Sequence, residues 1–213
     1  MTKLIGVYGA SGCGRGILPI VRLQMPQARV VFIDDAAPAD FINGHDVLSW
    51  SEFMYSPAGS KSVCLAIASP AVRATLAARC DHNNIPLFEA RHSSVVQFDQ
   101  VEIGDGACLS PFVVLTSNIS IGRGFHANLY TYVEHDCVIG DFVTFAPGAK
   151  CNGNVHIGDQ AYIGSGAVIR QGSAEKPLRI GAAATIGAGA VVLNDVPPGA
   201  TVVGNPATIL VRH

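Results

Sequence analysis

Charged residues are scarce in this chain of 213 residues: Asp, Glu, Lys and Arg make up 14% of it, and the formal net charge is −2. Neither Lys nor Arg gathers into a run, so the basic footprint of a nucleic-acid binder or an acidic-membrane binder is missing. No apolar run reaches the ~18 residues that span a bilayer, and the amino terminus shows no cleavage site. We therefore expect a cytoplasmic protein that binds small molecules or copies of itself, with no nucleic acid and no membrane as partner.

Closely spaced cysteine pairs are lacking as well. The six cysteines form no C-x-x-C pair and are widely scattered, at positions 13, 64, 80, 108, 137 and 151. Such scatter is typical of buried free thiols and argues against a zinc site, so we expect no metal. Apolar residues make up 49% of the chain, which is ample for a packed core in one large domain or two small ones.

What the chain does contain is a repeat in its second half. Ile-Gly occurs at 103–104, 121–122, 139–140 and 157–158, with a spacing of 18 each time. Eighteen is three sixes, and many of the intermediate sixth positions are also aliphatic: Leu109, Leu115, Val133, Ile163 and Ile169. This pattern predicts a triangular coil in which each short strand points one aliphatic residue inward. Residues 95–205 give room for about six such coils, stacked ~4.8 Å apart.

One irregularity interrupts the period. The next Ile-Gly that matches this series after 157–158 lies at 180–181, a gap of 23 residues where 18 are expected. The five extra residues fall in a polar stretch, so we predict that "SAEKP" (173–177) is an exposed loop that leaves the coil. It interrupts no inward aliphatic position, and the core need not depend on it.

Three histidines lie in the repeat. His126, Thr144 and Tyr162 are 18 residues apart and are expected to stack in one column, whereas His156 directly precedes an inward Ile and should point outward. His135 stands between two carboxylates, Glu134 and Asp136, in an otherwise apolar stretch. A lone histidine on a coil surface is by itself no site, and a rival chemical role for His126 stays open.

The first half has a different pattern. "KLIGVY" (3–8) predicts a buried strand, "GASGCGRG" (9–16) a glycine turn into a helix that runs to about residue 24, and "ARVVFIDD" (28–35) a second strand. A third strand at 62–68 leads into Ser69-Pro70, which starts a helix to about residue 82. Residues 1–90 therefore predict a Rossmann-like α/β domain, followed by an all-β domain at 91–213.

The glycine turn is a candidate phosphate site. Backbone N–H groups at the start of a helix can approach a phosphate, and acidic residues at the end of the second strand can accept hydrogen bonds from a ribose or a base. The spacing G-x-x-G-x-G departs from the dinucleotide fingerprint, so a simple tight turn remains an alternative on these residues alone.

The joined architecture resembles a known family. The repeat is similar to the left-handed parallel β-helix of hexapeptide acyltransferases, and "VPPGATVVGNPA" (196–207) is similar to the segment that closes it. The whole chain resembles bacterial nucleotide-sugar N-acetyltransferases that make diacetamidobacillosamine-type sugars and N-acetylperosamine, with sialic acid O-acetyltransferases as relatives. The motifs that carry this resemblance are "YGASGCG", "FIDD", "EHDCVIGDF" and "GAKCNGNV".

The resemblance implies an activity and its catalytic pair. It implies transfer of an acetyl group from acetyl-CoA to the 4-amino group of a nucleotide-linked 4-amino-4,6-dideoxy sugar, with UDP favoured and GDP-perosamine possible. His135 matches the catalytic base and Asp136 the acid that supports it. Imidazole can accept a proton near neutral pH, and a carboxylate on its other nitrogen fixes the tautomer. Glu134 receives no role.

The resemblance also implies binding residues and an assembly. The sugar nucleotide is expected against Gly12, Cys13, Gly14, Asp34, Asp35 and Ala68. Acetyl-CoA is expected in the groove between neighbouring β-helices of a homotrimer, against Asn128, Thr144, Gly153, Ser165 and Ala188. Cys13 and Thr144 stand where some family members carry histidines, which leaves open what Cys13 contacts and which sugar is bound.

Two other functions stay open from the sequence. One is a sugar O-acetyltransferase of the sialic acid type, which an amine-over-hydroxyl preference in a substrate panel would exclude. The other is a non-catalytic β-helix scaffold or a carbonic-anhydrase-like relative. The carbonic-anhydrase-like alternative would need several histidines to converge on a metal. Lys176 and Arg179 could meet phosphates of CoA, or the loop beside them could simply be solvated.

Overall fold

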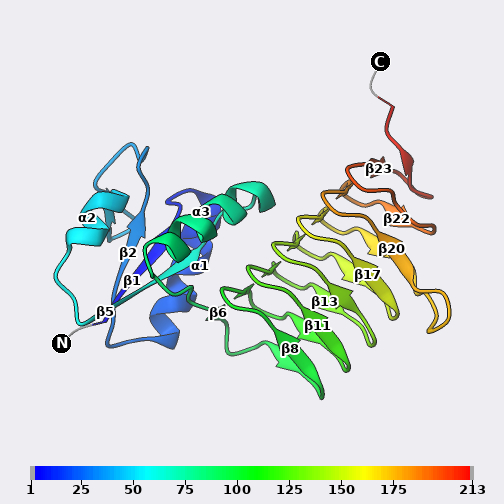
Figure 1. The fold of residues 1–213 in the computed structure, drawn as a ribbon, viewed down its shortest axis with the longest axis horizontal. Helices are drawn as coiled ribbons and strands as arrows, with labels where there is room; N and C mark the ends of the chain where they lie inside the picture. The colour runs from blue at the N-terminus through cyan, green and yellow to red at the C-terminus, as the bar shows by residue number, and fades with distance from the viewer. Residues whose placement is uncertain (1–2, 212–213) are drawn as a thin grey trace.

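A computed structural model describes residues 3–211 (Figure 1). The outermost residues of the two predicted domains, 1–2 and 212–213, lie outside the described residues. An open sheet with helices forms one part of the molecule, and a prism of stacked coils forms the other. The last short strand before the coils, β6 (Ala90–Arg91), already pairs with β9 (Cys108–Leu109) of the prism.

The sheet of the first part has the strand order β3-β4-β2-β1-β5. Its central strands pair in parallel, as expected from near-continuous apolar runs that are buried on both faces. The third strand ends at Leu65, earlier than predicted, and the carbonyls of Ile67 and Ala68 accept hydrogen bonds from Arg73. The bounds are β1 (Lys3–Tyr8), α1 (Gly12–Gln24), β2 (Arg29–Ile33), β3 (Phe41–Ile42), β4 (His45–Leu48), α2 (Trp50–Tyr55), β5 (Ser60–Leu65) and α3 (Pro70–His82).

The hairpin β3–β4 and helix α2 were not predicted, although local signals for both are in the sequence. Asn43 and Gly44 turn the hairpin with φ of 49° and 81°, the left-handed values that favour an Asn-Gly pair. Ser49 and Glu52 form a reciprocal capping box at the start of α2. The sheet is therefore mixed at this edge.

The second part is a parallel β-helix with three faces. Each coil contributes one strand to each face, and each strand bonds to the strand one coil later, as Cys108 N–H does to Phe125 O at 2.8 Å. The first face holds β6 (Ala90–Arg91), β9 (Cys108–Leu109), β12 (His126–Ala127), β15 (Thr144–Phe145), β18 (Tyr162–Ile163), β21 (Thr185–Ile186), β23 (Thr201–Val203) and β24 (Thr208–Ile209). The second face holds β7 (Val96–Gln97), β10 (Val114–Leu115), β13 (Tyr132–Val133), β16 (Lys150–Cys151), β19 (Val168–Ile169) and β22 (Val191–Val192). The third face holds β8 (Val101–Ile103), β11 (Ile119–Ile121), β14 (Val138–Ile139), β17 (Val155–Ile157) and β20 (Leu178–Ile180).

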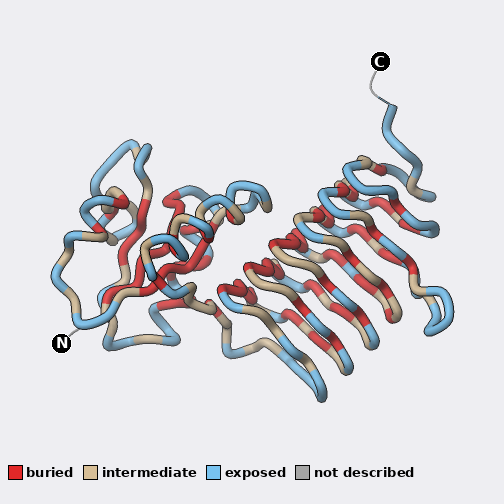
Figure 2. Tube along the Cα trace, in the orientation of Figure 1, coloured by how far each residue is buried: buried red, intermediate tan, exposed pale blue. Residues whose placement is uncertain are grey.

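The aliphatic positions of the repeat form the core of the prism, as Figure 2 shows by the buried segments that recur in every coil. The predicted inward residues are almost fully buried: Leu109, Leu115, Val133, Ile163 and Ile169 are exposed by 1% or less. The last strand, β24, departs from the pattern because it runs antiparallel to β23. The predicted architecture, a Rossmann-like α/β domain followed by a left-handed parallel β-helix, is confirmed.

The predicted loop is also present. Ile157 pairs with Ile180, so the coil resumes in register after the five extra residues. Residues 173–176 are exposed and Pro177 is half-buried, and the loop protrudes from the side of the prism (Figure 2).

The outward side chains differ among the three faces. On the third face they are mostly polar or charged: Glu102, Ser120, Val138, His156 and Arg179. On the second face they are mostly apolar: Val96, Val114, Tyr132, Lys150, Val168 and Val191. The predicted column on the first face is confirmed, because His126 pairs with Thr144 and Thr144 with Tyr162.

The amino-terminal domain packs on the first face. His126 is only 2% exposed and donates Nε2–H to Leu65 O at 2.7 Å, the proton being assigned from this contact. Thr144 Oγ1 donates to Ala68 O at 3.2 Å, and the Sγ atoms of Cys64 and Cys108 are 3.4 Å apart. The first face is thus closed by the carboxyl end of β5, which makes His126 an interdomain contact.

Candidate active site

Most of the predicted site residues of the β-helix lie on two edges of the prism. The turns between the first and second faces, including residues 110–113 and 128–131, form what we call the pocket edge. The turns between the second and third faces, including 116–118, 134–137 and 152–154, form the His135 edge. The two edges are separated by the whole width of the second face.

His135 and Asp136 form a bonded pair at the His135 edge. The Nδ1 atom of His135 lies 2.7 Å from Oδ2 of Asp136, and the two side chains are 43% and 47% exposed. A carboxylate at this distance places the proton on Nδ1 and leaves Nε2 as an acceptor. The pair therefore has the protonation pattern that a general base needs, on a side chain that is 43% exposed.

Asp136 is held by a second partner and by its backbone. Asn118 donates from Nδ2 to Oδ1 of Asp136 at 3.1 Å. The hydrogen bonds from His135 and then from Asn118 favour the ionised form, so the pKa of the Asp136 carboxyl lies below its usual range. Asn118, Asp136 and Asn154 stand 18 residues apart with φ of 59°, 57° and 55°, a conformation that Asn and Asp tolerate best.

Gly153 provides the surface on which the imidazole rests. A Cβ atom at this position would lie 2.5 Å from Cε1 and 2.6 Å from Nε2 of His135. Only a residue without a side chain lets the ring lie flat against the next coil, so Gly153 is sterically tied to the geometry of His135. Its predicted contact with acetyl-CoA stays a prediction.

The glycine turn opens helix α1 as expected. A Cβ atom at Gly14 would lie 1.7 Å from Gly9 O, so the turn requires glycine there, whereas Gly12 faces open space. Oδ2 of Asp34 accepts from Ala10 N–H at 3.0 Å, which ties the turn to the end of β2. The start of α1 therefore has the tight glycine turn that the predicted phosphate site requires, and phosphate binding there stays a prediction.

Asp35 lies at the centre of a bonded cluster. Its Oδ1 accepts from Trp50 N–H at 2.7 Å, and its Oδ2 accepts from the Tyr8 hydroxyl at 2.9 Å and from Arg79 Nη1 at 3.1 Å. Burial opposes ionisation of this carboxyl, but the bonds from Trp50, Tyr8 and Arg79 outweigh it and lower its pKa. Asp35 thus already fixes α2 and α3 around the carboxyl end of the sheet. Its predicted role toward the sugar nucleotide stays a prediction.

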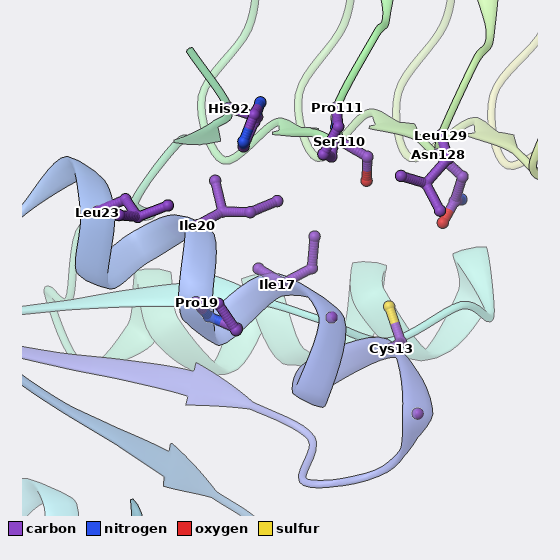
Figure 3. Close-up of a pocket in the computed structure, with 12 residues that line it drawn as sticks. Cys13, Ile17, Pro19, Ile20, Leu23, His92, Ser110, Pro111, Asn128 and Leu129 are labelled. Carbon is purple, nitrogen blue, oxygen red and sulfur yellow. The ribbon is translucent and has the colours of Figure 1, made fainter. Parts of the chain in front are cut away.

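A pocket of about 400 Å³ separates α1 from the pocket edge (Figure 3). Cys13 points across it from the helix toward Asn128, while Ile17 and Ile20 face His92 and Ser110. Burial raises the pKa of the Cys13 thiol to about 11, so the thiol is neutral near pH 7. The pocket is mostly apolar with a few polar groups, as small-molecule sites are. It contains two of the predicted sugar-nucleotide contacts, Gly12 and Cys13.

The remaining predicted contacts are divided between the edges. Asn128, Ser165 and Ala188 lie in turns of the pocket edge, one above another along the prism. Gly153 lies on the His135 edge. Thr144 is 1% exposed on the first face, with its hydroxyl bonded to Ala68 O. One chain thus brings the glycine turn and pocket together, but places His135 at a different edge.

Several neighbours of the predicted site residues were not predicted. Asn118 beside Asp136 was available from the period of 18, and the Tyr8–Arg79–Trp50 set around Asp35 follows only from the tertiary structure. Among residues 3–211, no group of three or more His, Cys, Asp or Glu side chains gathers so that it could hold a metal ion. No helix within the described part of the chain is long and apolar enough to cross a membrane.

The Asp35 cluster gives a prediction for stability. We expect Asp35→Asn to lower the midpoint of thermal unfolding at pH 7, because it removes the carboxylate that Arg79 and Tyr8 share. A carboxylate with a lowered folded pKa stabilises the fold above its unfolded pKa of about 3.9, and this contribution is lost as pH falls through the folded pKa. The difference from wild type should therefore shrink below about pH 4. Thermal scans from pH 7 to pH 3 measure it.

A matched control is Asp46→Asn, which breaks an ion pair with Arg29 that is about half exposed on both sides. Exposed pairs contribute little, so this variant should unfold close to wild type. Equal midpoints for Asp35→Asn and wild type at pH 7, or a difference that grows in acid, would contradict the assignment.

Comparison with known proteins identifies the family. Residues 4–80 match the family described as the PglD N-terminal domain. A GDP-perosamine N-acetyltransferase of Escherichia coli O157:H7 is 47% identical over 215 residues, which cover 99% of this chain and 97% of that protein. WeeI from Acinetobacter baumannii AYE is 54% identical with a TM-score of 0.96, covering 98% of this chain and 100% of that one.

A more distant structure has the same organisation. The acetyltransferase domain of PglB from Neisseria gonorrhoeae FA1090, in complex with acetyl coenzyme A, is 27% identical with a TM-score of 0.89, covering 99% of this chain and 100% of that one. The similarity extends over both domains, and the chain carries the His135–Asp136 pair at an exposed edge of its β-helix. This chain therefore belongs to the nucleotide-sugar N-acetyltransferases of the hexapeptide-repeat family.

Proposed function

We propose that the protein transfers the acetyl group of acetyl-CoA to the 4-amino group of GDP-perosamine. The choice of substrate rests on the 47% identity to a GDP-perosamine N-acetyltransferase over nearly the full length of both chains. The sequence favoured a UDP-linked sugar only weakly, because either nucleotide suits a glycine turn and paired aspartates. The relative named above is the reason to prefer GDP.

The His135–Asp136 pair supports the chemistry of this step. Nε2 of His135 accepts a proton from the 4-amino group of the sugar as the amine nitrogen attacks the thioester carbonyl. The C–S bond then breaks, the imidazolium of His135 gives this proton to the sulfur, and CoA leaves as the thiol. Asp136 keeps the Nδ1–H in place and stabilises the imidazolium that forms between these events. Both named relatives of known activity are acetyltransferases, and the curated one is an N-acetyltransferase, which favours an amine over the hydroxyl acceptor of the sialic acid type.

We further propose that three copies assemble so that each active site lies between two chains. The pocket and the glycine turn lie at the pocket edge, His135 lies at the other edge, and the apolar second face lies between them. If second faces turn inward around a threefold axis, the pocket edge of one copy meets the His135 edge of the next. Apolar outward residues such as Val114 and Val168 would then be covered.

Acetyl-CoA would lie in the groove that these edges form. Asn128, Ser165 and Ala188 would line one wall from one copy, and Gly153 the other wall from its neighbour. Above His135 the same edge leads to a hollow that Arg170, Lys176, Asn194 and Asp195 line, at the loop 173–177. The carboxylate of Asp195 accepts a hydrogen bond from the backbone N–H of Arg179. Arg170 and Lys176 are cationic, and charge-assisted hydrogen bonds to phosphate are strong, so this end of the groove suits the phosphates of CoA.

The substrate assignment is tested with purified protein, acetyl-CoA and a panel of nucleotide sugars. Release of free CoA should be fastest with GDP-perosamine, slower with UDP-linked 4-amino-4,6-dideoxy sugars and undetectable with the 4-hydroxy analogue. A clear preference for a UDP-linked sugar would overturn the choice of nucleotide. Activity on the hydroxyl analogue would restore the O-acetyltransferase alternative.

The catalytic pair is tested by substitution. His135→Ala should keep the fold and lower turnover by roughly 10²–10⁴, the usual contribution of a general base. Asp136→Asn should lower turnover less, since the imidazole remains. Glu134→Gln is the neighbouring control and should stay near wild type. Near wild-type turnover of His135→Ala with both substrates saturating would remove His135 as the base.

The loop beside the CoA groove gives a separate prediction. Deletion of residues 173–177 should leave thermal unfolding and the trimer in sedimentation velocity unchanged, because the loop is exposed and the core passes beneath it in register. The KM for acetyl-CoA should rise, since Lys176 is removed, while the KM for the sugar nucleotide stays constant. An unchanged KM for acetyl-CoA would reduce the loop to a tolerated insertion.

A further inference from the structure

Arg73 of helix α3 is a buried cation without a buried anion. Its side chain is fully enclosed, and every hydrogen-bond partner of its guanidinium within residues 3–211 is a backbone carbonyl. Burial lowers its pKa to about 10, so the group is still charged at neutral pH. Burying a charge is costly unless hydrogen bonds compensate for it, so the position of this arginine calls for an explanation.

The guanidinium joins three segments of chain. Nη1 donates to Ile67 O at 2.9 Å and to Ala68 O at 3.0 Å, in the segment that follows β5. Nε donates to Gly124 O at 3.2 Å, and Nη2 donates to the carbonyls of Phe142 and Val143. The last two segments are turns of successive β-helix coils, so one planar side chain spans both domains. Only the rigid fork of arginine offers five donors in such an arrangement.

The segment that Arg73 holds is adjacent to the proposed substrate site. Ala68 O receives a second hydrogen bond from the coil, from Thr144 Oγ1. Ala66 and Ile67 pack against the glycine turn so closely that a Cβ atom at Gly9 would lie 2.6 Å from Ile67 Cδ1. An uninterrupted chain of contacts thus runs from the β-helix through Arg73 to the turn at the start of α1.

We propose that Arg73 is a positioning residue for acetyl transfer, which fixes the glycine turn and the end of β5 in one orientation relative to the β-helix. This inference rests on the proposed function, in which the amino-terminal domain holds the sugar nucleotide and the β-helices supply His135. The angle between the domains then sets the distance from the amine to the base. Reacting groups must lie about 3–3.5 Å apart, and a misplacement of about 1 Å can cost ~10²-fold in rate.

A second interdomain contact provides a matched control. Arg123 of the β-helix bonds Asp81 near the end of α3 through both nitrogens, at 2.9 and 3.0 Å. This ion pair is partly exposed and lies at the opposite end of α3 from Ala68. It joins the same two domains but contacts no segment of the proposed substrate site.

The experiment compares Arg73→Lys and Arg73→Gln with Asp81→Asn in steady-state assays with GDP-perosamine and acetyl-CoA. Both Arg73 variants should raise the KM for GDP-perosamine, because the segments proposed to hold it are displaced, and should lower kcat/KM for it by about 10- to 100-fold. Their KM for acetyl-CoA should stay constant, because its proposed contacts all belong to β-helices. Asp81→Asn should leave both constants unchanged. KM does not depend on the fraction of enzyme that is folded. A change in KM for one substrate and not for the other therefore separates a positioning role of Arg73 from a loss of stability.

Each other result overturns the proposal. A fall in kcat alone with both KM values constant, equal changes for both substrates, or failure of both variants to fold would make Arg73 a purely structural residue. Wild-type protein that does not acetylate GDP-perosamine would refute the proposed substrate instead, and this is seen before any variant is measured.

Discussion

The stacking of one coil on the next is the constraint on which this molecule depends. Backbone N–H groups of the short strands bond to carbonyls of the neighbouring coil, and this ladder keeps equivalent positions in vertical columns. An inward aliphatic residue on each strand then closes a core. Because side chains at a given place in the period always reach the same edge, a residue's place in the repeat decides where its chemistry occurs. His135 lies on an exposed edge because its position is a turn position.

The repeat also explains how far the sequence predicts the structure. A period of 18 is a strict steric pattern, so the inward residues, the column from His126 to Tyr162 and the loop at 173–177 could all be predicted before any coordinates. The Rossmann-like strands were predicted because buried parallel strands are apolar along their whole length. The hairpin at Asn43-Gly44 and the capping box at Ser49 have equally clear local sequence signals, although neither element was predicted.

The remaining features depend on contacts between distant parts of the chain. That Asp35 bonds Tyr8, Arg79 and the backbone of Trp50 cannot be predicted from "FIDD", because the partners come from three other elements. Arg73 looks like an ordinary residue of a helix in the sequence, and only its carbonyl partners in two coils distinguish it. The sequence predicted that the glycine turn and His135 serve one reaction. In the fold of one chain, the glycine turn lies at the pocket edge of the β-helix and His135 lies at the His135 edge.

The antiparallel strand β24 has a consequence for solubility. A parallel β-helix is an open stack, and the last strand of a stack presents unpaired N–H and C=O groups that another molecule can extend. Here Val202 and Val203 of β23 pair with Ile209 and Thr208 of the same chain, which runs in the opposite direction. A second prism arriving end to end would meet a strand of the wrong polarity on this face. The reversal thus covers the last parallel edge of the first face, and it takes only two residues of strand.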